Sequence, residues 1–308
     1  MTKDTSAGQV NYSYEKQEGD EKVEAYGLKD LGWDKVPTDI IDKSVFDLIS
    51  LKGKKAIVTG AGGIGLGRAL SHRLAGLGAE VVMVDINEHV FENAKEVAEK
   101  WNTKTYPLIA DLMNFESVAQ MFKEAAELLG GRIDILINNA NYTIGGPFEK
   151  FTESDIRASV DGPFTSVIYC CRHVCDYMIP QKSGRIINIA SESAMRSDNV
   201  DISIYAASKS GVMGLTRSLA GELAKHNIIV NGVAPGVMLH SRLRDMFENP
   251  TPETLGVRKS MVISTEDTLF KRVSIPEEVA NTVAFLCSDA ASYINGQNIM
   301  NGGGMVVT

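Results

Sequence analysis

The sequence predicts an α/β fold in which helices cover both faces of one doubly wound parallel sheet. Strand-like and helix-like segments alternate from residue 55 onward, and repeated strand–helix units build parallel sheets. A glycine-rich turn at residues 60–67 joins the first strand to the first helix, and Asp85 ends the second strand. Ligands of such sheets bind beyond the carboxyl ends of the strands, so we expect the functional site there.

Apolar runs and apolar periodicity place the elements in order along the chain. Strands are expected at residues 55–59, 80–84, 106–110, 133–137, 185–190, 228–233 and 298–300. Helices are expected at residues 68–77, 90–101, 116–129, 205–223 and 276–286, with a long helical region over 152–178. Pro163 lies inside that region and should kink it, because proline cannot donate the helical hydrogen bond.

Residues 1–50 differ in composition from the rest of the chain. They hold 11 acidic and 6 basic residues, and so carry −5 of the formal net charge of −8. The first two dozen residues are polar, whereas the apolar content rises over residues 26–51. We expect an N-terminal extension at 1–50, either a packing arm or a weakly ordered leader, and a single domain at 51–308.

Composition and charge exclude several classes of protein. The chain has a pI near 5.3 and shows no basic stripe, so a nucleic-acid partner is not expected. It has no apolar run of the ~18 residues that a membrane helix needs, and its polar start lacks a signal-peptide pattern, which favours the cytoplasm. The four cysteines lack metal-ligand spacing and are interpreted as buried apolar side chains in a reducing compartment: Cys170, Cys171, Cys175 and Cys287.

The glycine-rich turn predicts a dinucleotide site. Glycines let the backbone approach a phosphate, and the helix N-terminus offers free N–H groups. A nucleoside-triphosphate loop is excluded because Lys-Ser/Thr does not follow Gly65. Asp85 would accept hydrogen bonds from a ribose diol and repel a 2′-phosphate, so NAD is preferred over NADP. The candidate cofactor-binding residues up to the fourth strand are Gly60, Gly65, Leu66, Gly67, Asp85, Asp111, Leu112, Asn138 and Ala140.

A second set of residues predicts acid–base chemistry. Tyr205 and Lys209 lie four residues apart and share one face of a helix. An ammonium beside the phenol should lower its pKa from about 10, so that the tyrosine can exchange a proton with an alcohol oxygen. Ser191 ends the fifth strand and is placed to hold the substrate oxygen, and Ser193 competes with it for this role.

Taken in order, these motifs resemble the short-chain dehydrogenase/reductase family over residues 51–308. The resemblance implies a Rossmann-type NAD-binding domain and hydride transfer between a secondary alcohol and a ketone. It implies that Tyr205 is the acid/base, that Lys209 binds the nicotinamide ribose and that Ser191 polarises the carbonyl. It also implies that Pro235 and Gly236 form the turn beside the nicotinamide. Family members are commonly tetramers or dimers, so we expect a homo-oligomer.

The chain departs from the family pattern in four places. The glycine turn has one residue more than usual if Gly65-Leu66-Gly67 is its second part, which we prefer to an alignment on Gly63-Ile64-Gly65. Asn141 stands where the family usually has Gly. The family's helix Asn is missing, and Asp161 could replace it. His240 lies near a position where the family often has Thr, and the neighbouring hydroxyl of Ser241 could serve instead.

A long insertion between residues 237 and 272 predicts a lid over the substrate. Its methionines and Phe247 favour an apolar lining, and Arg242, Arg244 and Arg258 could meet an anionic group or lie on the surface. We expect a cyclic alcohol or a hydroxyacyl-CoA as substrate, and a sugar or polyol is the alternative. A non-catalytic subunit that acts in assembly is a further alternative of a different class.

Overall fold

The computed structural model describes residues 28–32, 35–197 and 201–306, without the side chains of Leu28, Asp39, Arg242 and Glu253. The expectations for residues 1–27 and for the Arg242 side chain fall outside this part. The chain divides into two compact units, Met1–Lys43 and Ser44–Thr308. The described part of the first unit holds two 3₁₀ turns, η2 (Leu28–Leu31) and η4 (Thr38–Ile40).

The second unit is built on a seven-stranded sheet in which every neighbouring pair is parallel. The strand order is β3-β2-β1-β4-β5-β6-β7, which confirms the predicted doubly wound sheet. The strands are β1 (Lys55–Thr59), β2 (Glu80–Asp85), β3 (Thr105–Ile109), β4 (Ile135–Asn138), β5 (Gly184–Ile189), β6 (Ile228–Pro235) and β7 (Asn298–Asn301).

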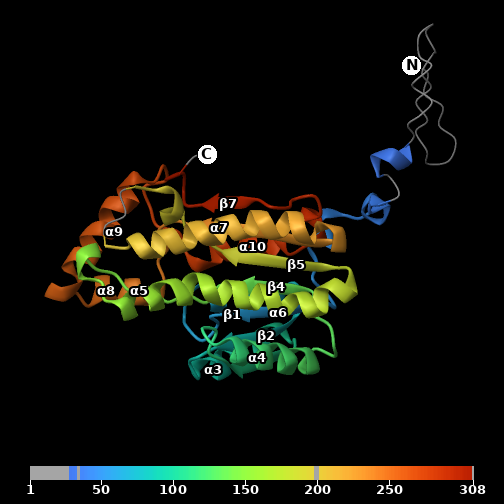
Figure 1. Ribbon diagram of the computed structural model, residues 1–308, viewed down its shortest axis with the longest axis horizontal. Coiled ribbons are helices and arrows are strands. Elements are labelled where there is room, and N and C mark those ends of the chain that lie inside the picture. Colours follow the sequence, from blue (N-terminus) through green and yellow to red (C-terminus); the bar gives the residue numbers. More distant parts are fainter. Residues whose placement is uncertain (1–27, 33–34, 198–200, 307–308) are drawn as a thin grey trace, which may run out of the picture. The chain divides into compact units, whose positions relative to one another are not determined.

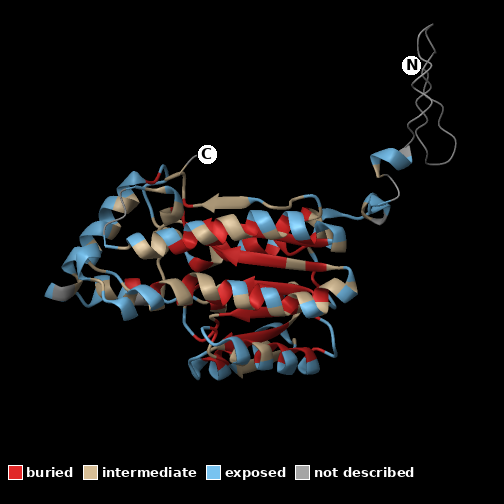
Figure 2. Cartoon of the chain, in the orientation of Figure 1, coloured by how far each residue is buried: buried red, intermediate tan, exposed pale blue. Residues whose placement is uncertain are grey.

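Two layers of helices cover the sheet, as Figures 1 and 2 show with the buried strands between them. One face packs against α2 (Leu66–Gly76), α3 (His89–Trp101) and α10 (Pro276–Leu286). The other face packs against α4 (Phe115–Leu128), α6 (Ser166–Gln181) and α7 (Ser203–Leu223). The short helix α1 (Val45–Ile49) contacts the 3₁₀ turn η10 (Asp289–Ala291).

The central strands are mainly apolar because both of their faces are covered. Side chains alternate between the two layers: in β1, Ala56 and Val58 pack in one core and Ile57 in the other. In β4, Ile135 and Leu136 divide in the same way. This alternation explains why these strands are continuous hydrophobic runs in the sequence rather than a polar–apolar repeat.

The order of the strands reverses between β1 and β4, and this is where the carboxyl ends open a crevice. The two strands pair in parallel, with Ala56 beside Ile135 and Val58 beside Ile137. The connections from β1 and from β4 leave in opposite directions. Such a topological switch point is the usual ligand site of a doubly wound sheet.

Two regions of the fold differ from the expectations. The helical region over 152–178 consists of α5 (Glu153–Val160), one π-helical turn (Asp161–Thr165) and α6, so that Pro163 is accommodated by a π turn. The insertion after residue 237 contains two helices that were not predicted, α8 (Ser241–Glu248) and α9 (Leu255–Asp267). Within the described residues, no helix combines the length and the apolar character needed to cross a membrane.

Candidate active site

The glycine turn lies at the switch point and is clamped to the end of β4. The Thr59 hydroxyl accepts hydrogen bonds from the backbone N–H groups of Asn139 (3.0 Å) and Ala140 (3.1 Å). The Asn139 amide in turn donates to the carbonyl oxygens of Thr59 (2.9 Å) and Gly60 (3.1 Å). These bonds join Gly60, the first residue of the turn, to the chain that follows β4. They thereby fix where a phosphate can approach the turn.

Gly60 and Gly67 at the two ends of the turn are required by close packing. Gly60 has a φ of +68°, and a Cβ there would lie 2.7 Å from the Cα of Ala140. A Cβ on Gly67 would collide with the carbonyl oxygen of Gly60. Gly67 therefore lets α2 begin directly against the strand end. This contact fits the alignment in which Gly65, Leu66 and Gly67 form the second part of the turn.

The N-terminus of α2 is suited to a pyrophosphate. The helix begins at Leu66 after Gly65, and no side chain caps its first N–H groups. Uncapped N–H groups and the positive end of the helix dipole favour an anion at this place. A Cβ on Gly65 would meet the His240 side chain at 3.7 Å, so the start of the lid lies beside the turn. These residues fit a dinucleotide, whose pyrophosphate would be held here.

Asp85 is fixed at the end of β2 by two backbone donors. Its carboxylate accepts from the N–H of Gly62 at 2.7 Å and from the N–H of Asn87 at 2.9 Å. The side chain is half-buried, and the following residues 86–88 are exposed and carry no positive charge. The position therefore offers an oriented carboxylate beside the glycine turn.

The other predicted adenosine contacts lie at the same edge of the sheet, with one difference. Asp111 and the buried Leu112 follow β3, and the Asp111 carboxylate accepts from the N–H of Met113 at 2.9 Å. The side chain of Asn138 at the end of β4, however, is buried and donates to the Asn188 side chain of β5 at 2.8 Å. A cofactor would therefore meet the neighbouring Ala140 and not the Asn138 amide.

Ser191 comes together with Tyr205 and Lys209 although it lies on a different element. Ser191 follows β5 and starts the 3₁₀ turn η7 (Glu192–Met195), whereas Tyr205 and Lys209 lie on α7. The Ser191 hydroxyl forms a hydrogen bond to Tyr205. The Lys209 Nζ lies 5.8 Å from the centre of the Tyr205 ring and donates to the carbonyl oxygen of Ile189 at 2.8 Å.

The pKa values of the pair differ from the simple expectation. Burial raises the pKa of Tyr205, and the hydrogen bond from Ser191 acts in the opposite direction. Burial also lowers the pKa of Lys209 from 10.5 to about 8. The prediction that Lys209 lowers the pKa of Tyr205 therefore does not describe this structure. The lysine is partly neutral near pH 8 and bonds to a backbone carbonyl, while desolvation of the phenol dominates.

The competition between Ser191 and Ser193 has a structural explanation. The backbone N–H of Ser193 donates to the Ser191 hydroxyl at 3.2 Å, which orients that hydroxyl. The turn that carries both serines is tied to α7, because the Ser210 hydroxyl donates to the carbonyl oxygen of Ala194 at 3.0 Å. Ser191 is the serine that reaches Tyr205.

A π turn lies in the segment where the family's Asn was expected. Pro163 has no N–H for the carbonyl oxygen of Ser159, which instead accepts from the Ser208 hydroxyl of α7 at 3.0 Å. Asp161 accepts from the Thr165 hydroxyl at 2.9 Å and, in the described part of the chain, makes no hydrogen bond to Lys209. The structure therefore gives no support to Asp161 as a replacement for the Asn.

The turn after β6 packs against Glu192, the residue that follows Ser191. β6 ends at Pro235, and a Cβ on Gly236 would lie 2.7 Å from both the Glu192 carboxyl group and the Cα of Gly302. His240 caps α8 by accepting from the N–H of Leu243 at 3.3 Å, which gives this loop histidine a local structural role. Ser241 begins the helix that follows.

Glu192 is a site residue that the sequence analysis missed. It directly follows Ser191 and is buried against Gly236 and Gly302. Burial raises its pKa, and the charge of Arg196 only partly opposes this. An acid after a strand normally predicts an exposed side chain, so its adjacency to Ser191 was the only available signal.

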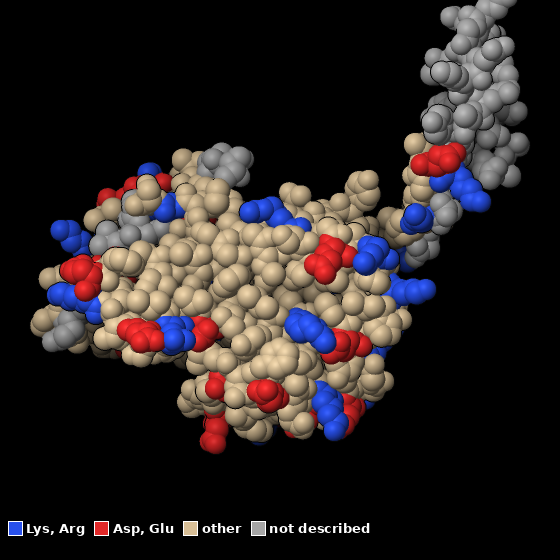
Figure 3. Space-filling view, viewed as in Figure 1, with Lys and Arg blue, Asp and Glu red and all other residues tan. Residues whose placement is uncertain are grey.

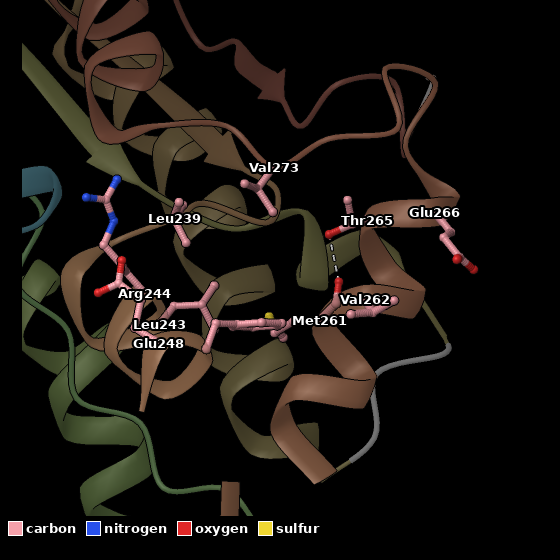
Figure 4. A pocket seen from close by; sticks show the side chains of 10 residues that line it. Leu239, Leu243, Arg244, Glu248, Met261, Val262, Thr265, Glu266 and Val273 are labelled. Atoms are coloured by element: carbon pink, nitrogen blue, oxygen red, sulfur yellow. Dashed lines mark hydrogen bonds between the residues drawn. The ribbon is translucent and has the colours of Figure 1, made fainter. Parts of the chain in front are cut away.

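The lid helices enclose an apolar cavity of about 660 Å³ between α8 and α9 (Figure 4). The apolar lining comprises Leu239, Leu243, Phe247, Met261, Val262 and Val273. Polar groups are confined to Arg244, Glu248, Thr265 and Glu266. The Thr265 hydroxyl donates to the Met261 carbonyl oxygen at 2.7 Å, so it is satisfied within its own helix. Arg258 is not part of the lining.

The chain is similar to known proteins over most of its length. Residues 60–306 match the model of a family described as enoyl-(acyl carrier protein) reductase. The chain is 35% identical over 265 residues to a 3-oxoacyl-(acyl-carrier-protein) reductase from Aquifex aeolicus, an alignment that covers 83% of this chain and 99% of the relative. It is 36% identical over 256 residues to 1,6-dihydroxycyclohexa-2,4-diene-1-carboxylate dehydrogenase from Pseudomonas putida, covering 82% and 93%.

The fold comparison leads to the same group of proteins. A solved structure of 7α-hydroxysteroid dehydrogenase, complexed with NADH and 7-oxo glycochenodeoxycholic acid, has a TM-score of 0.76 and 31% identity. The match covers 85% of this chain and 98% of that one. All three similar proteins are named as dehydrogenases or reductases, which leaves the non-catalytic alternative without support. The chain therefore belongs to the short-chain dehydrogenase/reductase family and is an oxidoreductase.

Proposed function

We propose that the protein interconverts a secondary alcohol and a ketone, with NAD as the cofactor and Ser191, Tyr205 and Lys209 as the catalytic residues. The observation that carries the proposal is the hydrogen bond between Ser191 and Tyr205, with the buried Lys209 ammonium 5.8 Å from the phenol ring. The hydroxyls of Ser191 and Tyr205 and the amine of Lys209 thereby lie near one another, although they come from two elements. Such a set can hold a substrate oxygen and transfer a proton to or from it.

Each residue has a distinct role in this proposal. Ser191 donates a hydrogen bond to the substrate oxygen and orients the carbon that reacts. Tyr205 removes the hydroxyl proton during oxidation and returns it during reduction. Lys209, which is buried beside the Tyr205 ring, binds the nicotinamide ribose. NAD, when bound, accepts the hydride equivalent that the alcohol carbon loses. Pro235 and Gly236 line the nicotinamide side.

The preference for NAD over NADP rests on Asp85. A fixed carboxylate accepts hydrogen bonds from a ribose diol and repels a phosphate ester at the same position. Residues 86–88 offer no Lys or Arg to compensate that repulsion. Gly60, Gly65, Leu66 and Gly67 would hold the pyrophosphate, and Asp111, Leu112 and Ala140 would surround the adenosine.

A cyclic secondary alcohol is the substrate class that the lid supports best. Six of the ten lining side chains of the lid cavity are apolar, which suits a compact ring and does not suit a polyol that needs many hydrogen bonds. Two of the similar proteins are named for ring compounds, a cyclohexadiene carboxylate and a hydroxysteroid. Arg244 at the cavity favours an acidic substituent, which keeps a hydroxyacyl thioester as the second candidate.

A homo-oligomer is the proposed assembly. A groove of about 440 Å³ between α6 and α7 is lined by apolar side chains, among them Ile168, Leu215 and Leu219. Arg172 lies in the same groove as Asp176 and Glu222, so a second copy related by a two-fold axis could match opposite charges. In Figure 3 the face over α6 and α7 is broadly uncharged between scattered ionic groups. We also propose a cytoplasmic location, which suits four free thiols.

The test is a cofactor titration followed by turnover measurements. NADH binding, followed by nucleotide fluorescence, should be tighter than NADPH binding, and cyclic secondary alcohols should be oxidised with NAD. Tyr205→Phe should lose turnover by a factor of about 10³ while the affinity for NADH stays the same. Retained turnover in Tyr205→Phe would place the acid/base elsewhere, and absent nucleotide binding would refute the proposal.

A further inference from the structure

The glycine turn absorbs its additional residue by bulging outward in its middle. Ala61 and Gly62 are buried, whereas Gly63 and Ile64 are exposed. The N–H of Ala61 donates to the carbonyl oxygen of Val84 at 3.0 Å, and the next N–H, of Gly62, reaches the Asp85 carboxylate at 2.7 Å. Ala61 therefore continues the backbone hydrogen bonding between β1 and β2, and Gly62 completes it with a bond to the Asp85 side chain.

Asn93 of α3 fixes the peptide units around Gly62. Its buried side-chain amide donates to the carbonyl oxygen of Ala61 at 2.8 Å and to that of Gly63 at 3.2 Å. Both carbonyls that flank Gly62 are thus held by one side chain from a packed helix. The position of the Gly62 N–H is consequently set by the helix layer and does not depend on the exposed bulge.

Gly62 must be a glycine because Asp85 lies against it. A Cβ at position 62 would be 2.8 Å from the Cγ of Asp85 and 3.0 Å from the carbonyl oxygen of Asn87. Its φ is not in the left-handed region, so the constraint comes from contact and not from backbone strain. At the neighbouring Gly63, by contrast, a Cβ would meet nothing within 4 Å.

We propose that Gly62, held by Asn93, determines cofactor specificity by locking the Asp85 carboxylate in the orientation that accepts a ribose diol. This inference rests on the proposed NAD preference. One carboxylate oxygen is bound by Gly62 and the other by the N–H of Asn87. A carboxylate held at both oxygens keeps its remaining lone pairs directed outward and cannot turn away to admit a 2′-phosphate. Orientation that exists before binding also saves the cost of ordering the side chain.

The experiment compares Gly62→Ala with its neighbour Gly63→Ala. We measure the dissociation constants of NADH and NADPH by nucleotide fluorescence for both variants, for wild type and for Asp85→Ala. Gly62→Ala should weaken NADH binding about five- to ten-fold, as expected for one displaced charge-assisted hydrogen bond, and should reduce discrimination against NADPH as Asp85→Ala does. Gly63→Ala should stay within about two-fold of wild type for both nucleotides.

A second variant covers the case in which Gly62→Ala does not fold. Asn93→Ala removes both turn-holding hydrogen bonds without adding an atom, and it should shift the NADH/NADPH ratio in the same direction. If Asp85→Ala loses discrimination while Gly62→Ala and Asn93→Ala keep it, the inference is overturned and the proposed function stands. If Asp85→Ala itself keeps the wild-type ratio, the proposed NAD preference fails instead.

Discussion

At the scale of single residues, the burial of the charged Lys209 side chain lowers the stability of the folded protein. Its side chain is only 2% exposed, and burial lowers its pKa to about 8. A buried base with a lowered pKa binds fewer protons in the folded than in the unfolded state. The free energy of unfolding must therefore rise with pH between the folded pKa of about 8 and the unfolded value of 10.5. At neutral pH the buried Lys209 side chain is still charged, and its desolvation destabilises the folded state.

We accordingly expect Lys209→Met to remove this pH dependence. Relative to Lys209→Met, the wild type should gain on the order of 2 kcal/mol between about pH 7 and about pH 9.5. Urea unfolding of both proteins at several pH values measures the difference, in which the shared titration of the buried thiols cancels. A difference that stays constant with pH would show that Lys209 is not desolvated in the folded state.

The Ser191 hydroxyl is expected to tune the proton affinity of Tyr205 as well as to hold the substrate. Its hydrogen bond lowers the pKa of Tyr205 against the effect of burial. Ser191→Ala should therefore reduce turnover by about 10² and move the acidic limb of the kcat/KM profile for alcohol oxidation to higher pH. Ser193→Ala is the control, since it keeps its backbone bond to Ser191. If the acidic limb does not move in Ser191→Ala, the Ser191 hydroxyl does not influence the pKa of Tyr205.

At the scale of elements, α5 and α7 depend on each other through the π turn. The carbonyl oxygen of Ser159 is released by Pro163 and bound by Ser208, one residue before Lys209 on α7. Ser208→Ala should lower the free energy of unfolding by about 1 kcal/mol, because a buried carbonyl loses a partner. Thermal unfolding would detect this. Ser218→Ala, at an exposed position of the same helix, should be neutral, and equal losses in both variants would refute the coupling.

The lid helices are expected to affect substrate binding more than chemistry. Phe247 lines the lid cavity while remaining 42% exposed. Phe247→Ala should raise KM for a cyclic alcohol several-fold, to about ten-fold, with a smaller change in kcat, since the aromatic contact area is lost in both ground and transition states. Leu255→Ala, on α9 outside the lining, should leave KM unchanged. A loss in kcat alone would assign Phe247 a different role.

The sequence predicted the elements and motifs that are local, and it missed those that depend on packing. Strand ends, the glycine turn, Asp85 and the Tyr205/Lys209 pair each follow from a few neighbouring residues. α9 was missed because none of its residues is buried, so it has no apolar stripe to recognise. Glu192 and Asn93 owe their importance to neighbours about 110 and 32 residues away, and no local pattern reports such contacts.

At the scale of the whole molecule, the α6–α7 groove is the surface that assembly should use. Leu219→Arg would place a charge among its apolar side chains and should convert an oligomer into smaller species, as measured by light scattering during gel filtration. Phe91→Arg on α3, at a side chain that is 50% exposed, is the control and should keep the wild-type mass. A wild-type mass for Leu219→Arg would exclude this groove as the interface.

The strand order also governs the sequence of events during synthesis. β1, β2 and β3 can pair as soon as they leave the ribosome, but the second edge of β1 has no partner until β4 follows, about 76 residues after the end of β1. Until then β1 is an open edge, and the Thr59 hydroxyl lacks Asn139 and Ala140. A nascent chain halted before β4 should therefore bind chaperones but not nucleotide. The nucleotide site comes into existence only when the two halves of the sheet join.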